Sequence, residues 1–185
     1  EGDYLEFRLR RYLTFAEFKS ELAPHFGLGL EGYATWTSPI RKYSDMVNHR
    51  LIKAVLTQQA CEKPQDEVLA RLQEARRQNR LVERDIADWL YCRYLADKVS
   101  ENAEFDAEVQ DVMRGGLRVQ LLENGASMFV PASTLHPNKD EMQVNADELA
   151  LYIQGERRYK IGDLVKVKLT EVREETRSIV GQLII

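Results

Sequence analysis

Apolar residues recur every three to four positions through much of the first hundred residues, a spacing that indicates amphipathic helices. This spacing predicts a short helix over residues 15–22 and one long helix, or two abutting ones, over residues 64–99. Ser38 followed by a proline is a strong helix start, so we expect a further helix over residues 38–56. Residues 27–37 contain three glycines and no stable period, which predicts a surface loop.

The second part of the chain shows a different pattern, with short apolar runs that are typical of strands. Turn signals occur at Gly115-Gly116 and at Asn124-Gly125, and a longer polar insertion spans residues 138–148. Five strands match the number in a small Greek-key barrel, so we predict an OB-fold. The predicted strands cover residues 105–112, 117–122, 127–130, 164–172 and 178–185.

The length of 185 residues is sufficient for two small domains, each with a core of its own. We place the boundary where the pattern changes, which gives a mainly helical domain at residues 1–102 and a five-stranded barrel at residues 103–185. The predicted fold class is therefore α+β. The chain opens in mid-pattern without a methionine, so we expect it to be part of a longer protein.

The formal net charge of −4 argues mildly against nonspecific binding to a polyanion. Residues 1–102 contain 16 basic and 16 acidic side chains, whereas residues 103–185 contain 10 basic and 14 acidic ones. Contact with a nucleic acid would therefore have to come from a local basic patch. No apolar run approaches the length that crosses a membrane, so a membrane is not an expected partner.

Cys61 and Cys92 lie in different segments without a partner at metal-site spacing, which predicts free thiols in the reducing cytoplasm. The three histidines are too far apart in the sequence for a zinc site. Residues 27–32 fit the pattern G-x-G-x-x-G, but no predicted strand precedes them and no helix begins directly after them. A dinucleotide-binding enzyme is therefore disfavoured.

Arg41 and Lys42 fall in the first turn of the predicted helix over residues 38–56, where free N–H groups and the helix dipole attract anions. Arg41 adds a planar guanidinium that can bind two phosphate oxygens at once. This combination predicts a site for a phosphodiester. The residues leave an alternative open, in which Arg41 pairs with Asp45 one turn along and the nearby aromatic side chains simply pack. These aromatic residues are Tyr33, Trp36 and Tyr43.

The sequence T-S-P-I-R-K-Y at residues 37–43, followed by D-M-V-N-H-R at residues 45–50, resembles a signature of the RNase II (RNB) family of exoribonucleases. In that family the signature lies near the end of the catalytic domain. The resemblance implies that Arg41 is a catalytic residue, which contacts the scissile phosphate and supports the charge that develops on its oxygens. Lys42 beside it is a candidate RNA-binding residue.

A second stretch, N-R-L-V-E-R-D-I-A-D-W-L at residues 79–90, is similar to a downstream helix of the same family. The resemblance implies that a glutamate of this helix lies near the 3′ end of bound RNA. Glu83 occupies the matching position, and its carboxylate could accept hydrogen bonds from ribose hydroxyls. A solvated helix face formed by Glu83 and Arg84 is the alternative.

The β-rich part of the chain resembles an S-one-type RNA-binding domain, an OB-fold unit named after a ribosomal protein. The similarity covers most of residues 105–185 and is carried by F-D-A-E-V, G-G-L-R-V, M-F-V-P-A-S-T-L, I-G-D-L-V-K-V-K-L and T-R-S-I-V. Such domains hold single strands with a basic groove and with aromatic faces on which bases stack. The RNA-binding candidates are the cations on or next to the predicted strands: Arg114, Arg118, Lys166, Lys168 and Arg177.

This β-rich part departs from the pattern of such domains at two positions. Leu117 stands where an aromatic residue is common, and Pro131 replaces a histidine that is usual in the third strand, so weaker stacking is expected. Phe129 is another aromatic residue, which we expect to face the barrel core.

The two resemblances imply that the chain is part of a 3′-to-5′ exoribonuclease that hydrolyses single-stranded RNA to nucleoside 5′-monophosphates. In this family clustered aspartates hold Mg²⁺, which activates water and stabilises the leaving oxygen. No such cluster occurs in the sequence, so the ligands are expected upstream of Glu1 and no metal is expected in this chain. The parent enzyme is expected to be a cytoplasmic monomer. The competing hypothesis is a non-catalytic OB-fold RNA-binding module.

We therefore expect that the 185-residue chain by itself does not degrade RNA, because it lacks the metal-binding aspartates. The measurement is incubation of a labelled single-stranded oligonucleotide with the purified chain and Mg²⁺, followed by gel electrophoresis. Shortening of the oligonucleotide that depends on Mg²⁺ would contradict this expectation.

Overall fold

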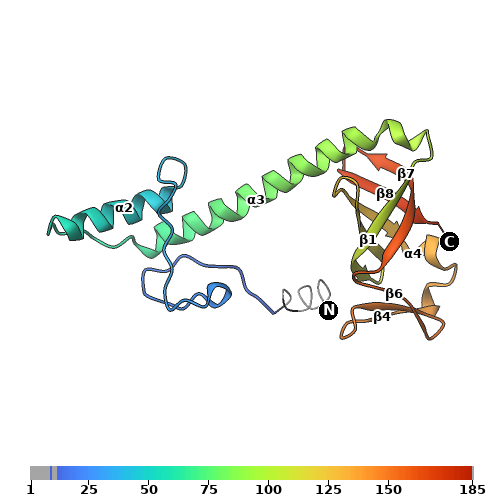
Figure 1. Ribbon diagram of the computed structural model, residues 1–185, viewed down its shortest axis with the longest axis horizontal. Helices are drawn as coiled ribbons and strands as arrows, with labels where there is room; N and C mark the ends of the chain where they lie inside the picture. The colour runs from blue at the N-terminus through green and yellow to red at the C-terminus, as the bar shows by residue number, and fades with distance from the viewer. Residues whose placement is uncertain (1–8, 10–11, 185) are drawn as a thin grey trace. The chain divides into compact units, whose positions relative to one another are not determined.

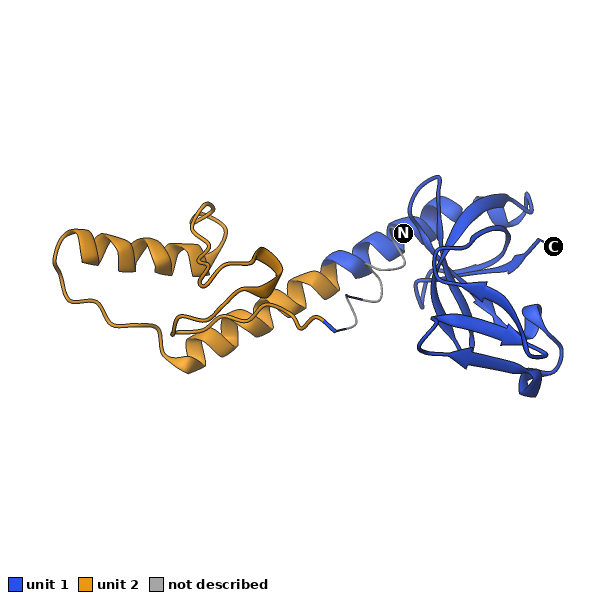
Figure 2. Ribbon diagram, turned by 60° about the horizontal axis from the view of Figure 1, so that its bottom comes forward, with its two compact units in different colours: residues 1–12, 83–185 blue, residues 13–82 orange. Residues whose placement is uncertain are grey.

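The computed structural model describes residues 9 and 12–184. The chain divides into two compact units, one of residues 13–82 and one that contains residues 83–184, and Figure 2 colours them separately. Helices come first and a closed five-stranded barrel follows (Figure 1), which confirms the predicted α+β class. The units reflect packing within the chain, so the domain boundary at residue 102 stays a prediction.

Two long helices precede the barrel. α2 covers Tyr43–Leu56 and α3 covers Asp66–Leu95, while the 3-10 helices η1 and η2 lie at Phe26–Leu28 and Asp97–Val99. α3 is one continuous helix of 30 residues, which is the first of the two predicted alternatives and agrees with the absence of internal glycine and proline. Residues 27–37 form a loop, as predicted, apart from the single turn of η1 at its start.

Residues 15–22 are irregular rather than helical, so the prediction of a short helix there was wrong. Contacts with α3 replace helical hydrogen bonds: the carbonyl of Ala16 accepts from Gln73 Nε2 (3.2 Å) and from Arg76 Nη1 (3.5 Å). The Arg76 guanidinium also lies over the ring of Phe18, 5.7 Å from its centre. So short a helix is marginal in water, and these contacts with a neighbouring helix decide its conformation.

Five strands close the barrel in the order β1-β2-β3-β8-β7, and β7 pairs back onto β1. β3 and β8 run parallel, while the other neighbouring strands are antiparallel. This arrangement confirms the predicted OB-fold, and every predicted strand matches an observed one to within two residues. The strands are β1 Glu104–Met113, β2 Gly116–Leu121, β3 Ser127–Pro131, β7 Leu164–Arg173 and β8 Ser178–Leu183.

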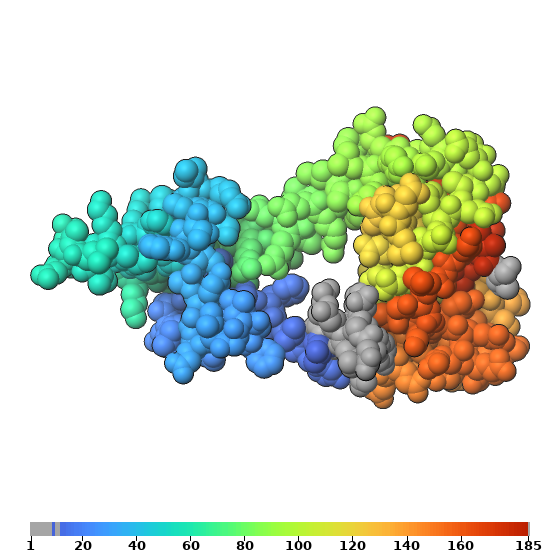
Figure 3. Space-filling view, viewed as in Figure 1, coloured from blue at the N-terminus to red at the C-terminus, as the bar shows by residue number. Residues whose placement is uncertain are grey.

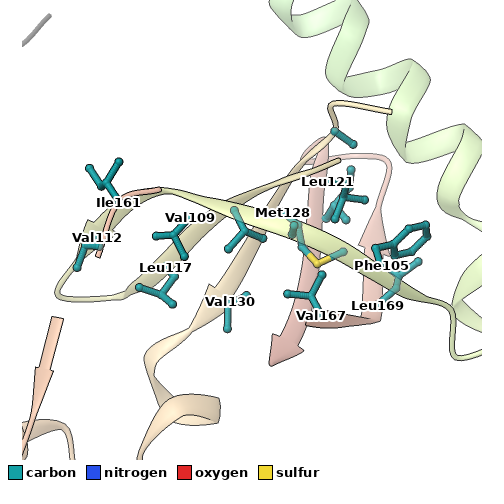
Figure 4. Close-up of a cluster of buried hydrophobic side chains, with 14 of the residues drawn as sticks. Phe105, Val109, Val112, Leu117, Leu121, Met128, Val130, Ile161, Val167 and Leu169 are labelled. Atoms are coloured by element: carbon teal, nitrogen blue, oxygen red, sulfur yellow. The ribbon is translucent and has the colours of Figure 1, made fainter. Parts of the chain in front are cut away.

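Side chains alternate between the inside and the outside of the barrel along each strand. On β2, Leu117, Val119 and Leu121 are fully buried, whereas Arg118 and Gln120 between them are exposed. Burial of each such aliphatic side chain stabilises the fold by about 1.5–3 kcal/mol, so the buried row fixes which residues face outward. Figure 4 shows side chains of other strands that join this core, among them Val109, Met128, Val130 and Val167.

The segment between β3 and β7 contains more secondary structure than the predicted polar insertion suggested. It forms the one-turn helix α4 at Ala132–Leu135, the 3-10 helix η3 at Lys139–Glu141, and a three-stranded antiparallel sheet. The strands of this sheet are β4 Met142–Asn145, β5 Ala150–Ile153 and β6 Glu156–Lys160. Leu151 and Ile153 of β5 are buried in the same apolar cluster as the barrel strands, so the sheet is part of the domain core.

The C-terminal turns of α3 pack against the barrel. Cys92 and Leu95 have no exposed surface, and the hydroxyl of Tyr91 donates a hydrogen bond to the carbonyl of Asn124 in the turn between β2 and β3 (2.9 Å). In Figure 3 the yellow surface of this turn lies against the yellow-green end of α3. This end of the helix therefore belongs to the same compact unit as the barrel.

The start of β2, directly after the turn from β1, requires glycine at position 116. Gly116 has φ +142°, and a Cβ atom there would lie 2.0 Å from the carbonyl oxygen of Val130. We expect Gly116→Ala to lower the free energy of unfolding by about 2–4 kcal/mol, measured by urea denaturation followed by circular dichroism. The matched control is Gly115→Ala, whose Cβ would meet only the ring of Phe129, at 3.8 Å. A loss no larger than that of the control would contradict this expectation.

Candidate nucleic-acid interface

A turn over residues 38–42 precedes α2 and carries Arg41 and Lys42. α2 begins at Tyr43, so the predicted helix start at Ser38 was wrong. The carbonyl oxygen of Ser38 accepts hydrogen bonds from the backbone N–H groups of Arg41 (3.2 Å) and Lys42 (2.9 Å). The two cations are thus held in a closed turn just before the helix, and not in its first turn.

The carboxylate of Asp45, in the first turn of α2, is bonded to the loop before the helix. It accepts hydrogen bonds from the hydroxyl of Thr35 (2.6 Å), the backbone N–H of Ser38 (2.9 Å) and the hydroxyl of Ser44 (3.1 Å). Asp45 has no exposed surface and is the one buried charged side chain in the part of the chain that the structure describes. The hydrogen bond from Thr35 is the largest cause that lowers the pKa of the Asp45 carboxyl, and with the other donors it outweighs burial. The group is therefore ionised at neutral pH.

The side chain of Arg41 is exposed and forms no hydrogen bond or ion pair with any residue described in the structure. The alternative in which Arg41 pairs with Asp45 is not observed, and the oxygens of that carboxylate accept from Thr35 and Ser38 instead. Lys42 beside it is also exposed. Two positive charges whose donors are available, at the N-terminus of a helix, form a surface that attracts an anion.

Two further side chains of α2 bind the loop before the turn. Asn48 Nδ2 donates to the carbonyl of Thr35 (2.7 Å), and His49 Nε2 lies 2.7 Å from the carbonyl of Trp36. A carbonyl only accepts, so this contact requires the proton on Nε2 of His49. The ring of Trp36 stacks on the ring of His49, with 5.1 Å between centres. Trp36 therefore packs on one side, as the alternative interpretation supposed, although it is half exposed, as Tyr43 is.

A second candidate surface lies on the outside of β2 and β3, and we call it the β2–β3 face; it consists of Arg118 and Phe129, and the exposed Arg114 lies in the adjoining turn between β1 and β2. Arg118 and Phe129 are direct cross-strand partners, and Phe129 is also paired with Val180 of β8. The Phe129 ring reaches the turn between β1 and β2, since a Cβ atom on Gly115 would lie 3.8 Å from its Cζ atom. Arg114 and Arg118 are exposed and form no ion pair with a described residue. The aromatic ring and the guanidinium of Arg118 thus share one surface, and Arg114 belongs to the turn that the ring reaches.

Phe129 lies on the outside of the barrel, so the prediction that it faces the core was wrong. Met128 and Val130 on either side are fully buried, whereas Phe129 is only partly buried. Leu117 is fully buried as well, so a side chain at that position offers no face on the surface for stacking. Of Leu117, Phe129 and Pro131, Phe129 is the residue that places an aromatic ring on the surface.

Two of the other predicted RNA-binding cations, Lys166 and Lys168, lie on β7. Their cross-strand partners on β1 are Asp106 and Glu104, and Lys166 Nζ is 3.8 Å from Asp106 Oδ1. β1 stands between β7 and β2 in the barrel, so its outward carboxylates separate these lysines from Arg118. A polyanion that crosses β1 would be repelled there.

Arg177 and Glu83 are the remaining predicted RNA-contacting residues. Arg177 lies in the turn between β7 and β8, and its Nη1 atom is 2.6 Å from Asp85 Oδ2 of α3. Its charge is therefore compensated by a carboxylate. Glu83 is exposed on α3 and forms no ion pair with Arg84 or with any other residue that the structure describes.

The carboxylates described by the structure do not form a metal site. Within residues 9 and 12–184, no three His, Cys, Asp or Glu side chains come together as possible ligands, and the oxygens of Asp45 are used by hydrogen bonds. A Mg²⁺ ion therefore does not fit these residues, and we assign no step to one.

Both cysteines are free thiols, as predicted, with Cys61 exposed and Cys92 buried. Burial raises the pKa of the Cys92 thiol, and the charges of Asp88 and Glu174 raise it further. The Cys92 thiol is therefore protonated at neutral pH. In the described part of the chain, no helix is both long and apolar enough to span a membrane.

Asp45 and Phe129 are the residues whose roles the sequence patterns did not show. The spacing of Asp45, Asn48 and His49 at i, i+3 and i+4 places three polar side chains on one face of a helix, which was an available signal. For Phe129, small or apolar residues at every second position of its strand were the signal, because they mark the inward face. These inward residues are Ala126, Met128, Val130 and Ala132.

Curated relatives match the whole chain. Exoribonuclease 2 of Haemophilus influenzae (strain 86-028NP) is 86% identical over 184 residues, which are 100% of this chain and 28% of that protein. The chain belongs to the RNase II (RNB) family. Exoribonuclease 2 of Mannheimia succiniciproducens is 83% identical over 184 residues. The chain spans 28% of the length of each of these RNB-family relatives.

Two family models agree with this RNB-family membership, and a solved structure shares the fold. The RNB domain model matches residues 1–58, which include the turn that carries Arg41, and the S1 RNA binding domain model matches residues 98–183, which include the barrel. RNase R of Mycoplasma genitalium, in complex with ribose methylated single-stranded RNA, has a TM-score of 0.76 over 95% of this chain and 28% of its own. Its sequence identity is 23%, so the likeness shows the shared fold.

Proposed function

We propose that the longer protein to which this chain corresponds hydrolyses single-stranded RNA from the 3′ end and releases nucleoside 5′-monophosphates. The observation that carries the proposal is the turn over residues 38–42, which presents the guanidinium of Arg41 without a carboxylate partner among the described residues. This turn lies in the segment that the RNB domain model matches, and the relatives at 86% and 83% identity are named exoribonuclease 2.

The chemistry assigned to Arg41 follows from its charge. Hydrolysis forms a bond from a water oxygen to phosphorus and breaks the bond from phosphorus to the 3′ oxygen, and negative charge on the phosphoryl oxygens must be stabilised meanwhile. A guanidinium stays protonated at any physiological pH and donates two parallel N–H groups. Arg41 would therefore donate hydrogen bonds to these oxygens. Mg²⁺ belongs to this proposal only for the longer protein, with ligands outside the described residues.

We also propose that the β2–β3 face binds single-stranded RNA. The ring of Phe129 offers a platform for one base, and Arg118 on the neighbouring strand would contact an adjacent phosphate, with Arg114 available in the turn next to the ring. The match to the S1 RNA binding domain model and the single-stranded RNA bound by M. genitalium RNase R support this proposal. The carboxylates along β1 favour a path for the strand over β2 and β3 instead of over β1.

The remaining expectations for this family are part of the same proposal. They are a monomeric longer protein in the cytoplasm and RNA contacts by further charged residues. These residues are Lys42, Glu83, Lys166, Lys168 and Arg177.

Changing Arg41 to alanine in the longer protein is expected to lower the turnover of single-stranded RNA by about 10²- to 10³-fold. The affinity for RNA should change by less than about threefold, because the guanidinium acts mainly on charge that develops in the transition state. Turnover is measured by release of labelled nucleotide, and affinity by fluorescence anisotropy without Mg²⁺. Arg71→Ala, an exposed arginine of α3 without an ion pair among described residues, is the matched control. Unchanged turnover in Arg41→Ala would rule out the proposed role.

Changing Phe129 to alanine in the chain is expected to weaken the binding of a single-stranded oligonucleotide by about 5- to 150-fold. This loss corresponds to the free energy of stacking one base on an aromatic ring, about 1–3 kcal/mol. Arg118→Ala should reduce the slope of log K against log salt concentration by about 0.7, because one phosphate contact is lost. Fluorescence anisotropy titrations at several salt concentrations measure both effects. Arg173→Ala is the control, since two hydrogen bonds to Glu171 (both 2.7 Å) already hold its guanidinium. Full affinity of Phe129→Ala would show that RNA does not stack there.

A further inference from the structure

The loop before α2 is bonded to the helix by side chains that share one helical face. Asp45, Asn48 and His49 are spaced i, i+3 and i+4, so they lie on the same side of α2. Their hydrogen-bond partners in the loop all lie within residues 35–38, immediately before the turn that carries Arg41. The loop is therefore hydrogen-bonded to the helix at Thr35, Trp36 and Ser38, and these bonds fix the position of Ser38, where the turn begins.

We propose that Asp45 is a positioning residue for Arg41, through the turn that its carboxylate binds. The path is short, because Asp45 Oδ2 accepts from the backbone N–H of Ser38 (2.9 Å). The carbonyl of the same Ser38 then accepts from the N–H groups of Arg41 (3.2 Å) and Lys42 (2.9 Å). The buried carboxylate thus sets the backbone of Arg41 through one intervening residue and does not touch the guanidinium. This proposal rests on the proposed function of Arg41.

The distribution of donors around Asp45 explains why a carboxylate in this place does not neutralise Arg41. Its Oδ1 atom accepts from the hydroxyls of Thr35 and Ser44, and its Oδ2 atom accepts from Ser38. A carboxylate paired directly with Arg41 would compete with a phosphate for the same N–H groups. Since Asp45 is buried and bonded to other donors, the guanidinium remains exposed to a ligand from outside.

The position of the guanidinium matters because it must match the phosphoryl oxygens in the transition state. A displacement of about 1 Å at a reacting group can cost about 10²-fold in rate, even when the change that causes it lies elsewhere. Loss of the Asp45 carboxylate frees the N–H of Ser38 and releases the turn. The effect should therefore appear in turnover through Arg41 more than in RNA affinity.

The test uses the longer protein with Asp45→Ala, with Arg41→Ala and with both changes, and it measures kcat and KM on single-stranded RNA. Asp45→Ala is expected to lower kcat by about 10- to 100-fold and to change KM by less than about threefold. In the Arg41→Ala background the same change should lower kcat by less than about twofold, because no guanidinium remains to be positioned. Thermal unfolding of each variant shows that the protein is folded.

If Asp45→Ala does not fold, two milder variants test whether the loss of kcat depends on the presence of Arg41. Asp45→Asn keeps one oxygen that can accept from Ser38, and Thr35→Val removes a single donor to the carboxylate. Each variant is expected to lower kcat by about fivefold, the change that corresponds to the loss of one hydrogen bond. Both losses should again be absent when Arg41 is alanine. Asp66→Asn, exposed in the first turn of α3, is the charge-matched control and should leave kcat unchanged.

Two results would overturn the proposal. Unchanged kcat in folded Asp45→Ala would show that the carboxylate is not needed. Equal losses of kcat from the Asp45 change with and without Arg41 would show that Asp45 acts independently of that arginine. Unchanged kcat in Arg41→Ala by itself would instead contradict the proposed function on which the proposal rests.

Discussion

The hydrogen bonds that Asp45 accepts from the loop over residues 35–38 determine the geometry of Arg41. A buried charge is stable only when donors surround it, and here two hydroxyls and a backbone N–H do so. The loop must therefore fold back onto α2, and the helix begins only at Tyr43. As a consequence, Arg41 projects from a closed turn with no carboxylate partner among the described residues.

Closure of the barrel imposes a comparable constraint on the second unit. Because each strand has one face inside, the burial of Leu117 and Met128 places the neighbouring Arg118 and Phe129 outside, on adjacent strands. The two candidate sites thus arise in different units, one from a buried charge and one from strand alternation. They suit different tasks in the proposed function: the β2–β3 face holds the strand, and Arg41 acts on the phosphodiester.

The elements that the sequence predicted well are those with a long or repeated pattern, namely α3 and the five barrel strands. The failures occur where a contact distant in the sequence outweighs a local preference. Residues 15–22 have helical spacing, yet α3 supplies the donors for Ala16 from 57 and 60 positions away. Ser38 and its proline form a good local helix start, yet the helix begins only at Tyr43, after a turn whose Ser38 N–H is bonded to the buried carboxylate of Asp45. Such contacts are invisible in local spacing, whereas the outward position of Phe129 could have been predicted from its buried neighbours.

A structure of the longer protein bound to a short single-stranded RNA would show whether Arg41 contacts the reacting phosphodiester. We expect a guanidinium nitrogen of Arg41 to lie about 2.7–3.1 Å from a non-bridging oxygen of the 3′-terminal phosphodiester, while Asp45 still accepts from Ser38. A bound RNA whose terminal phosphodiester contacts other residues, with Arg41 pointing into solvent, would contradict this expectation.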